Sequence, residues 1–487
     1  MLEKNQDIEL EIDGITAEGS GVGHYDGIAV FVPNTAVGDL IQCHIVKTKK
    51  TYAFGKAMAV LKASKDRVAP DCEAAAQCGG CCFRHISYDA ELQIKQQRVE
   101  DAFQRIAHLD VPFLPIIGSA EQKGYRNKAQ YPVGFSAAHV SGRRLRNAQM
   151  SKSVQDKGLQ IGFYARGSHR IIPNQQCSLQ PKVFENILDI VRSWILRYNI
   201  ATYDEVQHKG MLRHIYIRQG YHTGQIMVCL VVNGNNIPHT FPLVETLRNS
   251  IPGFTTLVAN YNQQKTNVIM GEKSEALYGD GFIEDTLLDC TFRISPRSFY
   301  QVNTAQAEVL YTKAAEMAGL LPDADAPAPD AQPSPSQDGP ILLDLYCGIG
   351  TIGLTMASHV RRLYGVEIIP EAIEDAKLNA AINHKDNAEF ICGDAAAAAA
   401  RLKADGVKED IILVDPPRNG LDAQLVETIA EFDPERLVYV SCDPATLARD
   451  CALFKDHGYT VQKVQPIDMF PRTAHVETVV LMSRKEK

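Results

Sequence analysis

The sequence predicts an α/β protein built from three parts, which are an N-terminal β-barrel, a central α+β domain and a C-terminal doubly wound domain. Short runs of alternating apolar and polar residues, separated by Gly, Asn and Asp, fill residues 7–62 and are typical of a small antiparallel barrel. Residues 63–290 mix helical spacing with strand-like runs that end in turns. After residue 340, strand signals alternate with helix signals, which indicates a parallel sheet covered by helices.

The expected domain boundaries follow these changes of pattern and lie at 4–62, 63–290 and 291–487. Residues 321–339, LPDADAPAPDAQPSPSQDG, interrupt the third part with Pro, Ala and Asp and almost no large apolar side chain. A segment of this composition has little to bury in a core, so we expect a flexible surface insertion there.

Composition limits the class of protein. The chain has 487 residues, of which 45% are hydrophobic and 22% charged, as in globular proteins of two to four domains. No stretch approaches twenty apolar residues and the N-terminus is polar, so we expect a cytoplasmic protein with no membrane partner. We further expect a monomer. Twelve cysteines in such a protein favour metal ligation or catalysis over a disulfide framework.

The net charge of -8 argues against a uniformly positive surface, although local basic patches can still bind phosphates. One such patch ends the predicted barrel, where lysines alternate with aromatic residues in a pattern that suits phosphates and stacked bases: Lys47, Lys49, Lys50, Tyr52, Phe54 and Lys56. The same pattern also fits a solvated edge strand. Two further basic stretches, 123–133 and 141–152, fit either RNA contacts or solvated loops.

Acidic residues follow the expected strands of the doubly wound domain. A strand ends near Asp344 and is followed by Gly348, Gly350 and Gly353, and the next strand ends at Glu367, where an acid can bind ribose hydroxyls. Two later strands end at Asp394 and Asp415. The spacing D-x-x-x-G-x-G favours S-adenosyl-L-methionine over NAD or FAD, although the acids could also be incidental to the fold.

Cys442 ends the apolar run VYVSC and is either a packing residue or a nucleophile. Methylation of carbon 5 of a pyrimidine requires a nucleophile at carbon 6, because the ring carbon does not otherwise attack a sulfonium methyl group readily. A cysteine thiolate is suited to this addition, and a carboxylate is an adequate base for the later removal of the carbon-5 proton. The residues alone leave both interpretations of Cys442 open.

Four C-terminal motifs resemble the RNA uracil-5-methyltransferases of the RumA/TrmA family: DLYCGIGTIGL, DPPRNGL, YVSCDPATLARD and DMFPRTAHVETVVLM. The resemblance extends over nearly the whole chain and implies a Rossmann-like catalytic domain. It further implies that Cys442 is the nucleophile, Glu477 the base, and Asp415 a residue beside the cofactor and target base. The remaining contacts to S-adenosyl-L-methionine that it implies are Gln301, Tyr346, Thr351, Glu367 and Asp394.

The N-terminal part resembles the TRAM domain, an OB-like RNA-binding module. Cys72, Cys78 and Cys81 stand close together and need a fourth ligand from elsewhere, which Cys177 can supply. Their spacing alone fits a structural zinc as well as an iron–sulfur cluster. The resemblance implies that these four cysteines hold a [4Fe-4S] cluster in the central domain, with the adjacent Cys82 outside the ligand set.

The function that the resemblance implies is transfer of methyl from S-adenosyl-L-methionine to carbon 5 of a uridine, most closely as in the members that act on 23S ribosomal RNA. The alternatives are a 5-methyluridine methyltransferase acting on tRNA, a non-catalytic RNA-binding assembly factor, and a methyltransferase for a small molecule or protein. Two departures from the family pattern are Asp443, where asparagine is usual, and the Pro-rich insertion.

Overall fold

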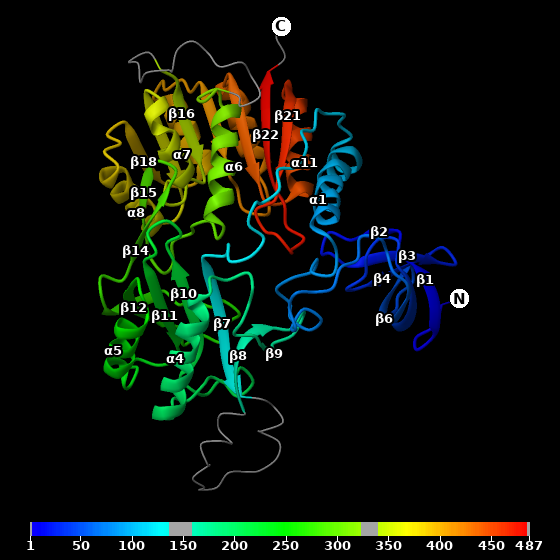
Figure 1. The fold of residues 1–487 in the computed structure, drawn as a ribbon. Coiled ribbons are helices and arrows are strands. Elements are labelled where there is room, and N and C mark those ends of the chain that lie inside the picture. Colours follow the sequence, from blue (N-terminus) through cyan, green and yellow to red (C-terminus); the bar gives the residue numbers. More distant parts are fainter. Residues whose placement is uncertain (1, 136–157, 323–338, 485–487) are drawn as a thin grey trace.

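The computed structural model describes residues 2–135, 158–322 and 339–484 (Figure 1). The basic stretch 141–152 and residues 323–338 of the expected insertion lie outside the described residues. The C-terminal domain occupies one end of the molecule, the central domain the other, and the N-terminal sheet lies to one side of both (Figure 1). None of the described helices has the length and apolar character needed to span a lipid bilayer.

The N-terminal part is a six-stranded sheet whose strand order is β1-β5-β6-β4-β3-β2. Its strands are β1 (Asp7–Glu11), β2 (Gly14–Ile15), β3 (Gly21–Tyr25), β4 (Ile28–Val32), β5 (Leu40–Thr48) and β6 (Tyr52–Lys62). Alternating side chains are buried along β1 and most of β5, as a sheet with one apolar face requires. The pair β4 and β6 is parallel, which differs from the all-antiparallel pairing that the sequence predicts.

The central domain is a seven-stranded sheet of order β13-β12-β11-β10-β7-β8-β9. Its elements are β7 (Lys128–Phe135), β8 (Leu159–Tyr164), β9 (Ile171–Pro173), α4 (Val183–Tyr198), β10 (Leu212–Gln219), β11 (Ile226–Val232), α5 (Thr240–Ser250), β12 (Phe254–Tyr261) and β13 (Lys273–Tyr278). Every residue of β11 is buried, because helices cover one face and the following hairpin covers the other. That hairpin consists of β14 (Ile283–Leu287) and β15 (Cys290–Ile294).

The C-terminal sheet has seven strands in the order β18-β17-β16-β19-β20-β22-β21. Its strands are β16 (Ile341–Leu345), β17 (Arg362–Glu367), β18 (Ala388–Cys392), β19 (Ile411–Val414), β20 (Arg436–Ser441), β21 (Tyr459–Ile467) and β22 (Glu477–Arg484). β22 runs antiparallel to both of its neighbours, whereas the other pairings are parallel. The predicted doubly wound sheet is therefore present, with one antiparallel strand that the strand–helix alternation did not indicate.

Helices cover both faces of the C-terminal sheet, and each layer has its own apolar core. The helices are α6 (Thr304–Met317), α7 (Thr351–Met356), α8 (Pro370–Ile382), α9 (Ala395–Ala404), α10 (Ala423–Phe432) and α11 (Pro444–Asp456). α9 begins with the predicted helix of six alanines, and the carboxylate of Asp394 caps it by accepting the N–H of Ala397 at 3.0 Å. Asp394 and the start of α9 therefore lie together just after β18.

One early segment of the chain lies against the C-terminal sheet rather than the central one (Figure 1). α1 (Tyr88–Ala102) and the π-helical turn Phe103–Ala107 pack beside α11. Phe113 and Ile117 then form parallel bridges with Val464 and Ile467 of β21. Residues 88–117 therefore cover the edge of the C-terminal sheet that β21 would otherwise expose.

Candidate active site and cysteine pocket

The polar residues that follow the parallel strands lie along one edge of the C-terminal sheet. Asp344 is near the end of β16, Glu367 ends β17, and Asp415 follows β19. Cys442 directly follows β20, the next strand in the sheet. Because the carboxyl ends of parallel strands meet at one edge, these side chains share the place where ligands of open α/β sheets bind.

The glycine loop after β16 is held by two of the acids. The N–H of Gly353 donates to Asp344 Oδ2 at 3.0 Å, and the N–H of Gly348 donates to Glu367 Oε2 at 3.2 Å. A Cβ on Gly353 would come within 2.7 Å of that Asp344 oxygen, so only glycine allows the helix to begin this close to the strand. Burial raises the pKa of Asp344 to about 8. The loop is thus fixed between β16 and β17.

The other cofactor contacts expected from the sequence reach the same edge from separate elements. Tyr346 has a left-handed backbone with φ of 65° and begins the loop after β16. Thr351 is the first residue of α7, and its hydroxyl lies 3.2 Å from that of Tyr311 on α6. Gln301 is buried just before α6, where its backbone carbonyl accepts a hydrogen bond from Asn127 Nδ2 at 2.9 Å. Tyr311 and Asn127 hydrogen-bond to two of these candidate residues, and neither was itself a candidate from sequence.

Cys442 and Glu477 are neighbours because β20 and β22 pair antiparallel. Ser441, the last residue of β20, is opposite Thr478, so Cys442 and Glu477 each lie one residue beyond this last pair. Glu477 is buried, with 3% of its surface exposed, whereas the Cys442 thiol is only partly covered. The thiol and the carboxyl therefore lie at adjacent strand ends, near enough for the carboxyl to raise the pKa of the thiol.

The electrostatics of this group favour its uncharged forms. Burial, and after it the carboxyls of Glu477 and Asp415, raise the pKa of the Cys442 thiol to about 11. Burial and then the charge of Asp415 raise the pKa of Glu477 to about 8, and burial raises that of Asp415 to about 7. The exposed Arg418 acts in the opposite direction on the pKa values of Cys442 and Glu477, so it stabilises their charged forms.

Asp443 has a structural role that explains why an aspartate is tolerated beside the thiol. Its Oδ1 accepts the N–H groups of Ala445 at 3.0 Å and Thr446 at 3.1 Å, which caps α11. Asparagine offers the same side-chain oxygen, so either residue can cap this helix. The aspartate adds a negative charge that raises the pKa of Cys442 slightly further.

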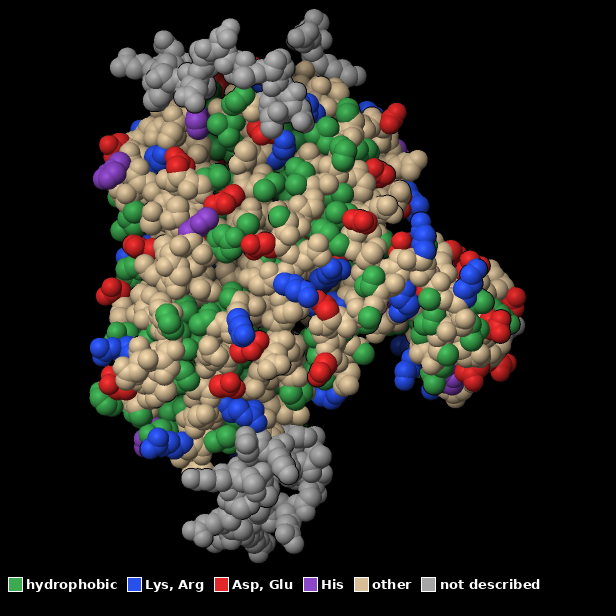
Figure 2. All heavy atoms as spheres, viewed as in Figure 1, with side chains coloured by type: hydrophobic (Ala, Val, Ile, Leu, Met, Phe, Trp, Pro, Cys, Tyr) green, Lys and Arg blue, Asp and Glu red, His purple; other side chains and the backbone are tan. Residues whose placement is uncertain are grey.

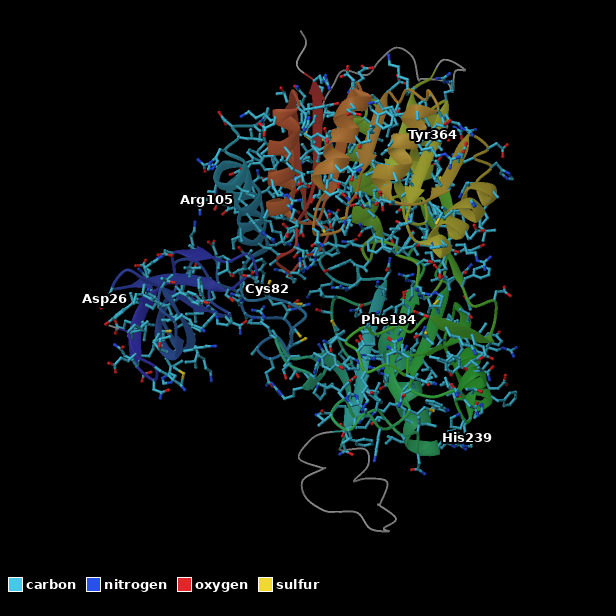
Figure 3. The ribbon with its side chains drawn as sticks, turned by 180° about the vertical axis from the view of Figure 1, so that it is seen from behind. Asp26, Cys82, Arg105, Phe184, His239 and Tyr364 are labelled. Atoms are coloured by element: carbon cyan, nitrogen blue, oxygen red, sulfur yellow. The ribbon has the colours of Figure 1, made fainter. Side chains whose placement is uncertain are left out.

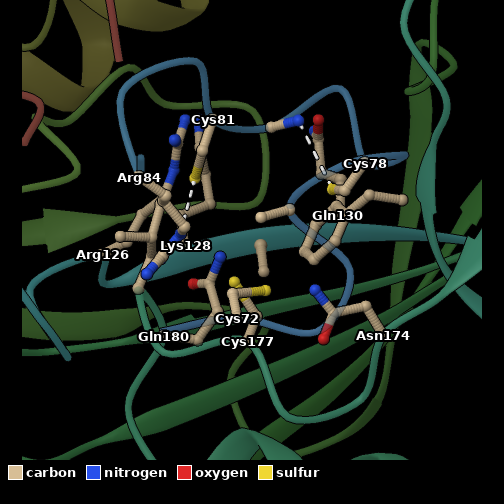
Figure 4. A pocket seen from close by; sticks show the side chains of 15 residues that line it. Cys72, Cys78, Cys81, Arg84, Arg126, Lys128, Gln130, Asn174, Cys177 and Gln180 are labelled. Atoms are coloured by element: carbon tan, nitrogen blue, oxygen red, sulfur yellow. Dashed lines mark hydrogen bonds between the residues drawn. The ribbon is translucent and has the colours of Figure 1, made fainter. Parts of the chain in front are cut away.

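The four candidate ligand cysteines line one cavity of about 230 Å³ in the central domain (Figure 4). Cys72, Cys78 and Cys81 come from the loop before α1, and Cys177 comes from the segment between β9 and α4. The N–H of Gly80 donates to Cys78 Sγ at 3.4 Å, as shown in Figure 4. Within the described residues, no group of three or more His, Cys, Asp or Glu side chains could hold a metal ion.

Basic side chains surround the same cavity. Arg84 donates from Nε to Cys81 Sγ at 3.4 Å, and Arg126 and Lys128 also line the wall. Cys82 is buried elsewhere, where the N-terminal, central and C-terminal parts meet (Figure 3), and does not line the cavity. Four thiols, N–H donors to two of them, two arginines and a lysine suit an anionic group held by sulfur. The four cysteines expected as ligands from the sequence thus line one cavity, but they do not converge on a single ion.

Two family models match the chain. The TRAM domain matches residues 2–58, and the tRNA (uracil-5-)-methyltransferase family matches residues 331–485. A protein of Halalkalibacterium halodurans named as an uncharacterized RNA methyltransferase is 42% identical over 483 residues, which covers 99% of this chain and 98% of that protein. A relative of the same description from Clostridium tetani is 40% identical and covers 99% and 97% of the two chains.

A solved structure is similar over almost the full length of the chain. It is the Pyrococcus abyssi tRNA (uracil-54, C5)-methyltransferase in complex with S-adenosyl-L-homocysteine, with a TM-score of 0.73 and 26% identity. The alignment covers 97% of this chain and 99% of that one. All three parts of the molecule are therefore included in the similarity.

Proposed function

The chain belongs to the RNA uracil-5-methyltransferase family with an N-terminal TRAM domain, and from this premise we propose that Cys442 and Glu477 carry the chemistry on a uridine of 23S ribosomal RNA. The protein is an S-adenosyl-L-methionine-dependent RNA uracil-5-methyltransferase. The observation that supports the two roles best is the antiparallel pairing of β20 and β22, because Cys442 and Glu477 directly adjoin its last pair and the Glu477 carboxyl is near enough to raise the pKa of the thiol.

The proposed reaction has three steps. The Cys442 thiolate adds to carbon 6 of the uracil, which makes carbon 5 nucleophilic. Carbon 5 then takes the methyl group of S-adenosyl-L-methionine, and S-adenosyl-L-homocysteine remains. Glu477 removes the proton from carbon 5, and the electrons of that C–H bond restore the 5,6 double bond as the cysteine leaves.

The charges of the site are consistent with this order of events. The thiol with a pKa of about 11 must lose its proton before addition, and Arg418 is placed to stabilise the thiolate. The carboxyl of Glu477, with a pKa of about 8, must be ionised before it can accept the carbon-5 proton. We therefore assign Arg418 to charge stabilisation and Asp415 to the wall beside the cofactor and the base.

The cofactor contacts that we propose are Gln301, Tyr346, Thr351, Glu367, Asp394 and Asp415. Glu367 ends β17, where the acid of a nucleotide-binding sheet meets ribose hydroxyls. The exposed Ile368 and Ile369 follow it directly and offer an apolar surface for an adenine ring. This arrangement supports a cofactor bound across the ends of β16, β17 and β18.

The RNA surface that we propose lies between the N-terminal sheet and the rest of the molecule. Figure 2 shows Asp and Glu on the outer side of this sheet and Lys and Arg on the side toward the other domains. The outer strand β1 exposes Asp7, Glu9 and Glu11. On β6, the partly exposed Phe54 lies 5.5 Å from the ring of Tyr52. Aromatic rings beside lysines suit stacked bases of a single strand.

The second candidate substrate is tRNA, and one observation favours it. The solved P. abyssi enzyme is a tRNA (uracil-54, C5)-methyltransferase, and its similarity covers 97% of this chain. The presence of an N-terminal sheet and a central domain therefore does not distinguish ribosomal RNA from tRNA. The assignment to 23S ribosomal RNA rests on the resemblance of the TRAM domain and the four cysteines to members with that substrate.

The substrate is tested by mapping 5-methyluridine in both RNAs from strains with and without the gene. We expect at least one position in 23S ribosomal RNA to lose its methyl group in the deletion strain, and a plasmid copy to restore it. A plasmid copy with Cys442→Ala is the matched control and should restore nothing. Loss confined to tRNA would reject the ribosomal assignment while leaving the chemistry intact.

We also propose that Cys72, Cys78, Cys81 and Cys177 hold a [4Fe-4S] cluster. The donors of such a cluster bind four different iron atoms, so they can stand apart around the cavity wall. Arg84, Arg126 and Lys128 would offset the negative charge of the group. A cluster supplies no step of this methylation, so its role in the proposal is to fix the loop 72–84.

Protein purified without oxygen is expected to be brown and to contain about four irons and four sulfides per chain. Cys177→Ser should lose most of this iron, whereas Cys82→Ser should retain it because Cys82 lies off the cavity wall. Iron and labile sulfide are measured by colorimetric assay, and visible absorbance gives an independent readout of the cluster. Stoichiometric zinc without sulfide would reject the cluster.

A further inference from the structure

The loop that leads to Glu477 is tied to a segment almost four hundred residues earlier. The loop spans 468–476, between β21 and β22. Lys95 on α1 donates from Nζ to Asp468 Oδ1 at 2.6 Å and to the carbonyl of Phe470 at 3.2 Å. Tyr88, at the start of the same helix, donates its hydroxyl to Asp468 Oδ2 at 2.7 Å. α1 therefore fixes the beginning of the loop.

Arg472 fixes the middle of the loop. Its φ of 72° is left-handed, a conformation that costs about 1 kcal/mol or more for a residue other than glycine. Its N–H donates to Glu91 Oε1 at 2.7 Å, and its carbonyl accepts the N–H groups of Cys82 at 3.0 Å and Phe83 at 3.2 Å. Its guanidinium donates to the carbonyl of Ile86 at 3.3 Å. These bonds hold the strained backbone in place.

The contact between α1 and the loop includes buried ion pairs of Lys95 with Glu91 and Asp468, which are a costly way to add stability alone. The side chains of Lys95, Glu91 and Asp468 are exposed by 1%, 0% and 0%. Removing three charges from water carries a desolvation cost that apolar side chains of similar size would avoid. What the charges provide is one defined geometry for the loop, because each donor has a specific acceptor.

We propose that Lys95 and Arg472 are positioning residues for Glu477, and that residues 82–98 hold the loop so that the carboxyl meets the carbon-5 proton. The inference rests on the proposed function, since it requires Glu477 to act as the base. It predicts that loss of the contact slows mainly the removal of the carbon-5 proton. Cys442 is positioned by β20 and by the capped start of α11, not by this loop. Addition and methyl transfer should therefore be less sensitive than proton removal.

The test separates the two steps by single-turnover kinetics with labelled RNA. Denaturing gels measure the covalent protein–RNA band, and digestion of the RNA measures released 5-methyluridine. In Arg472→Ala, we expect the rate of band formation to stay within a few-fold of wild type and its decay to slow about 10- to 100-fold, as expected when a reacting group is misplaced by about 1 Å. The band should therefore accumulate.

Arg472→Gly is the matched variant, because glycine adopts the left-handed conformation without strain and keeps the three hydrogen bonds that the Arg472 backbone makes. Its decay rate should lie between those of wild type and Arg472→Ala. Lys95→Met removes the charge at similar length and should resemble Arg472→Ala. Lys403→Met, in an exposed ion pair on α9, is the control for a lysine change and should match wild type. Melting curves show which variants are folded.

Equal slowing of band formation and decay in the folded variants would show that the contact is only structural and overturn the inference. Unchanged decay in Arg472→Ala would also overturn it. If Lys95→Met does not fold, the pair Arg472→Ala and Arg472→Gly still decides. A wild-type protein that forms no covalent band refutes the proposed chemistry instead, so the two failures are distinguishable.

Discussion

Cys442→Ala protein is expected to bind RNA and S-adenosyl-L-methionine but to form no covalent band and no 5-methyluridine. Without a nucleophile at carbon 6, carbon 5 is not activated, and the rate should fall by about four to six orders of magnitude, as when the nucleophile of a covalent enzyme is removed. Because the thiol is only partly buried, its loss should change the melting temperature little. Transfer of labelled methyl from the cofactor to RNA measures the rate.

Cys451→Ala is the matched control, since Cys451 is a buried thiol of α11 with 1% exposure. It should lower the melting temperature by removing a packed side chain and leave the methylation rate near wild type. Cys442→Ala should therefore lower the methylation rate and not the melting temperature, whereas Cys451→Ala should lower the melting temperature and not the methylation rate. Methylation at carbon 5 by the Cys442→Ala protein would falsify the covalent mechanism.

Glu477→Gln protein is expected to form the covalent band, transfer the methyl group and then release the RNA very slowly. An amide does not accept the carbon-5 proton, and loss of a general base slows its step by about 10²- to 10⁴-fold. The band should carry the labelled methyl group, which shows that both earlier steps have occurred. Glu427→Gln, on the exposed face of α10, is the control and should release product at the wild-type rate.

The same substitution should stabilise the protein in a pH-dependent way. The pKa of Glu477 is raised to about 8, so the folded state disfavours the carboxylate. Below pH 4.5 the Glu477 carboxyl is protonated in both the folded and the unfolded protein, so it does not lower the free energy of unfolding. As the pH rises to about 8, it lowers the free energy of unfolding progressively. The Gln variant should therefore melt higher than wild type by roughly 5 °C at about pH 8.5 and about equally at pH 4.5. In the release experiment, a Glu477→Gln protein that frees RNA at the wild-type rate would show that a group other than Glu477 removes the carbon-5 proton.

Local patterns were sufficient to predict the sheet edge at which the candidate site residues lie. Asp344, Glu367, Asp415 and Cys442 each follow an apolar strand signal, and parallel strands bring such residues together whatever the loops between them. The alanine run at 395–400 was likewise predicted as a helix, because alanine has the highest helix propensity. These predictions need only the sequence of short segments and the rule that the carboxyl ends of parallel strands meet at one edge of a sheet.

The neighbours of the site were not predictable in the same way. β22 runs antiparallel, and this places Glu477 beside Cys442, but strand direction is set by the pairing partner rather than by the strand's own sequence. Lys95 and Asn127 lie in stretches that look like an ordinary helix and a basic loop. Their partners, Asp468 and Gln301, are 373 and 174 residues away, so no local pattern could assign them.

The cover that residues 88–117 provide for β21 has a consequence for biosynthesis. Tyr88 and its partner Asp468 are 380 residues apart, so at about 5–20 residues per second roughly 20 to 80 s pass between their synthesis on the ribosome. During that interval Val99 and Phe103, both fully buried in the native protein, have no sheet to pack against. The nascent chain therefore leaves these apolar side chains uncovered for that time, and we expect chaperones that bind such groups to increase the yield of active enzyme.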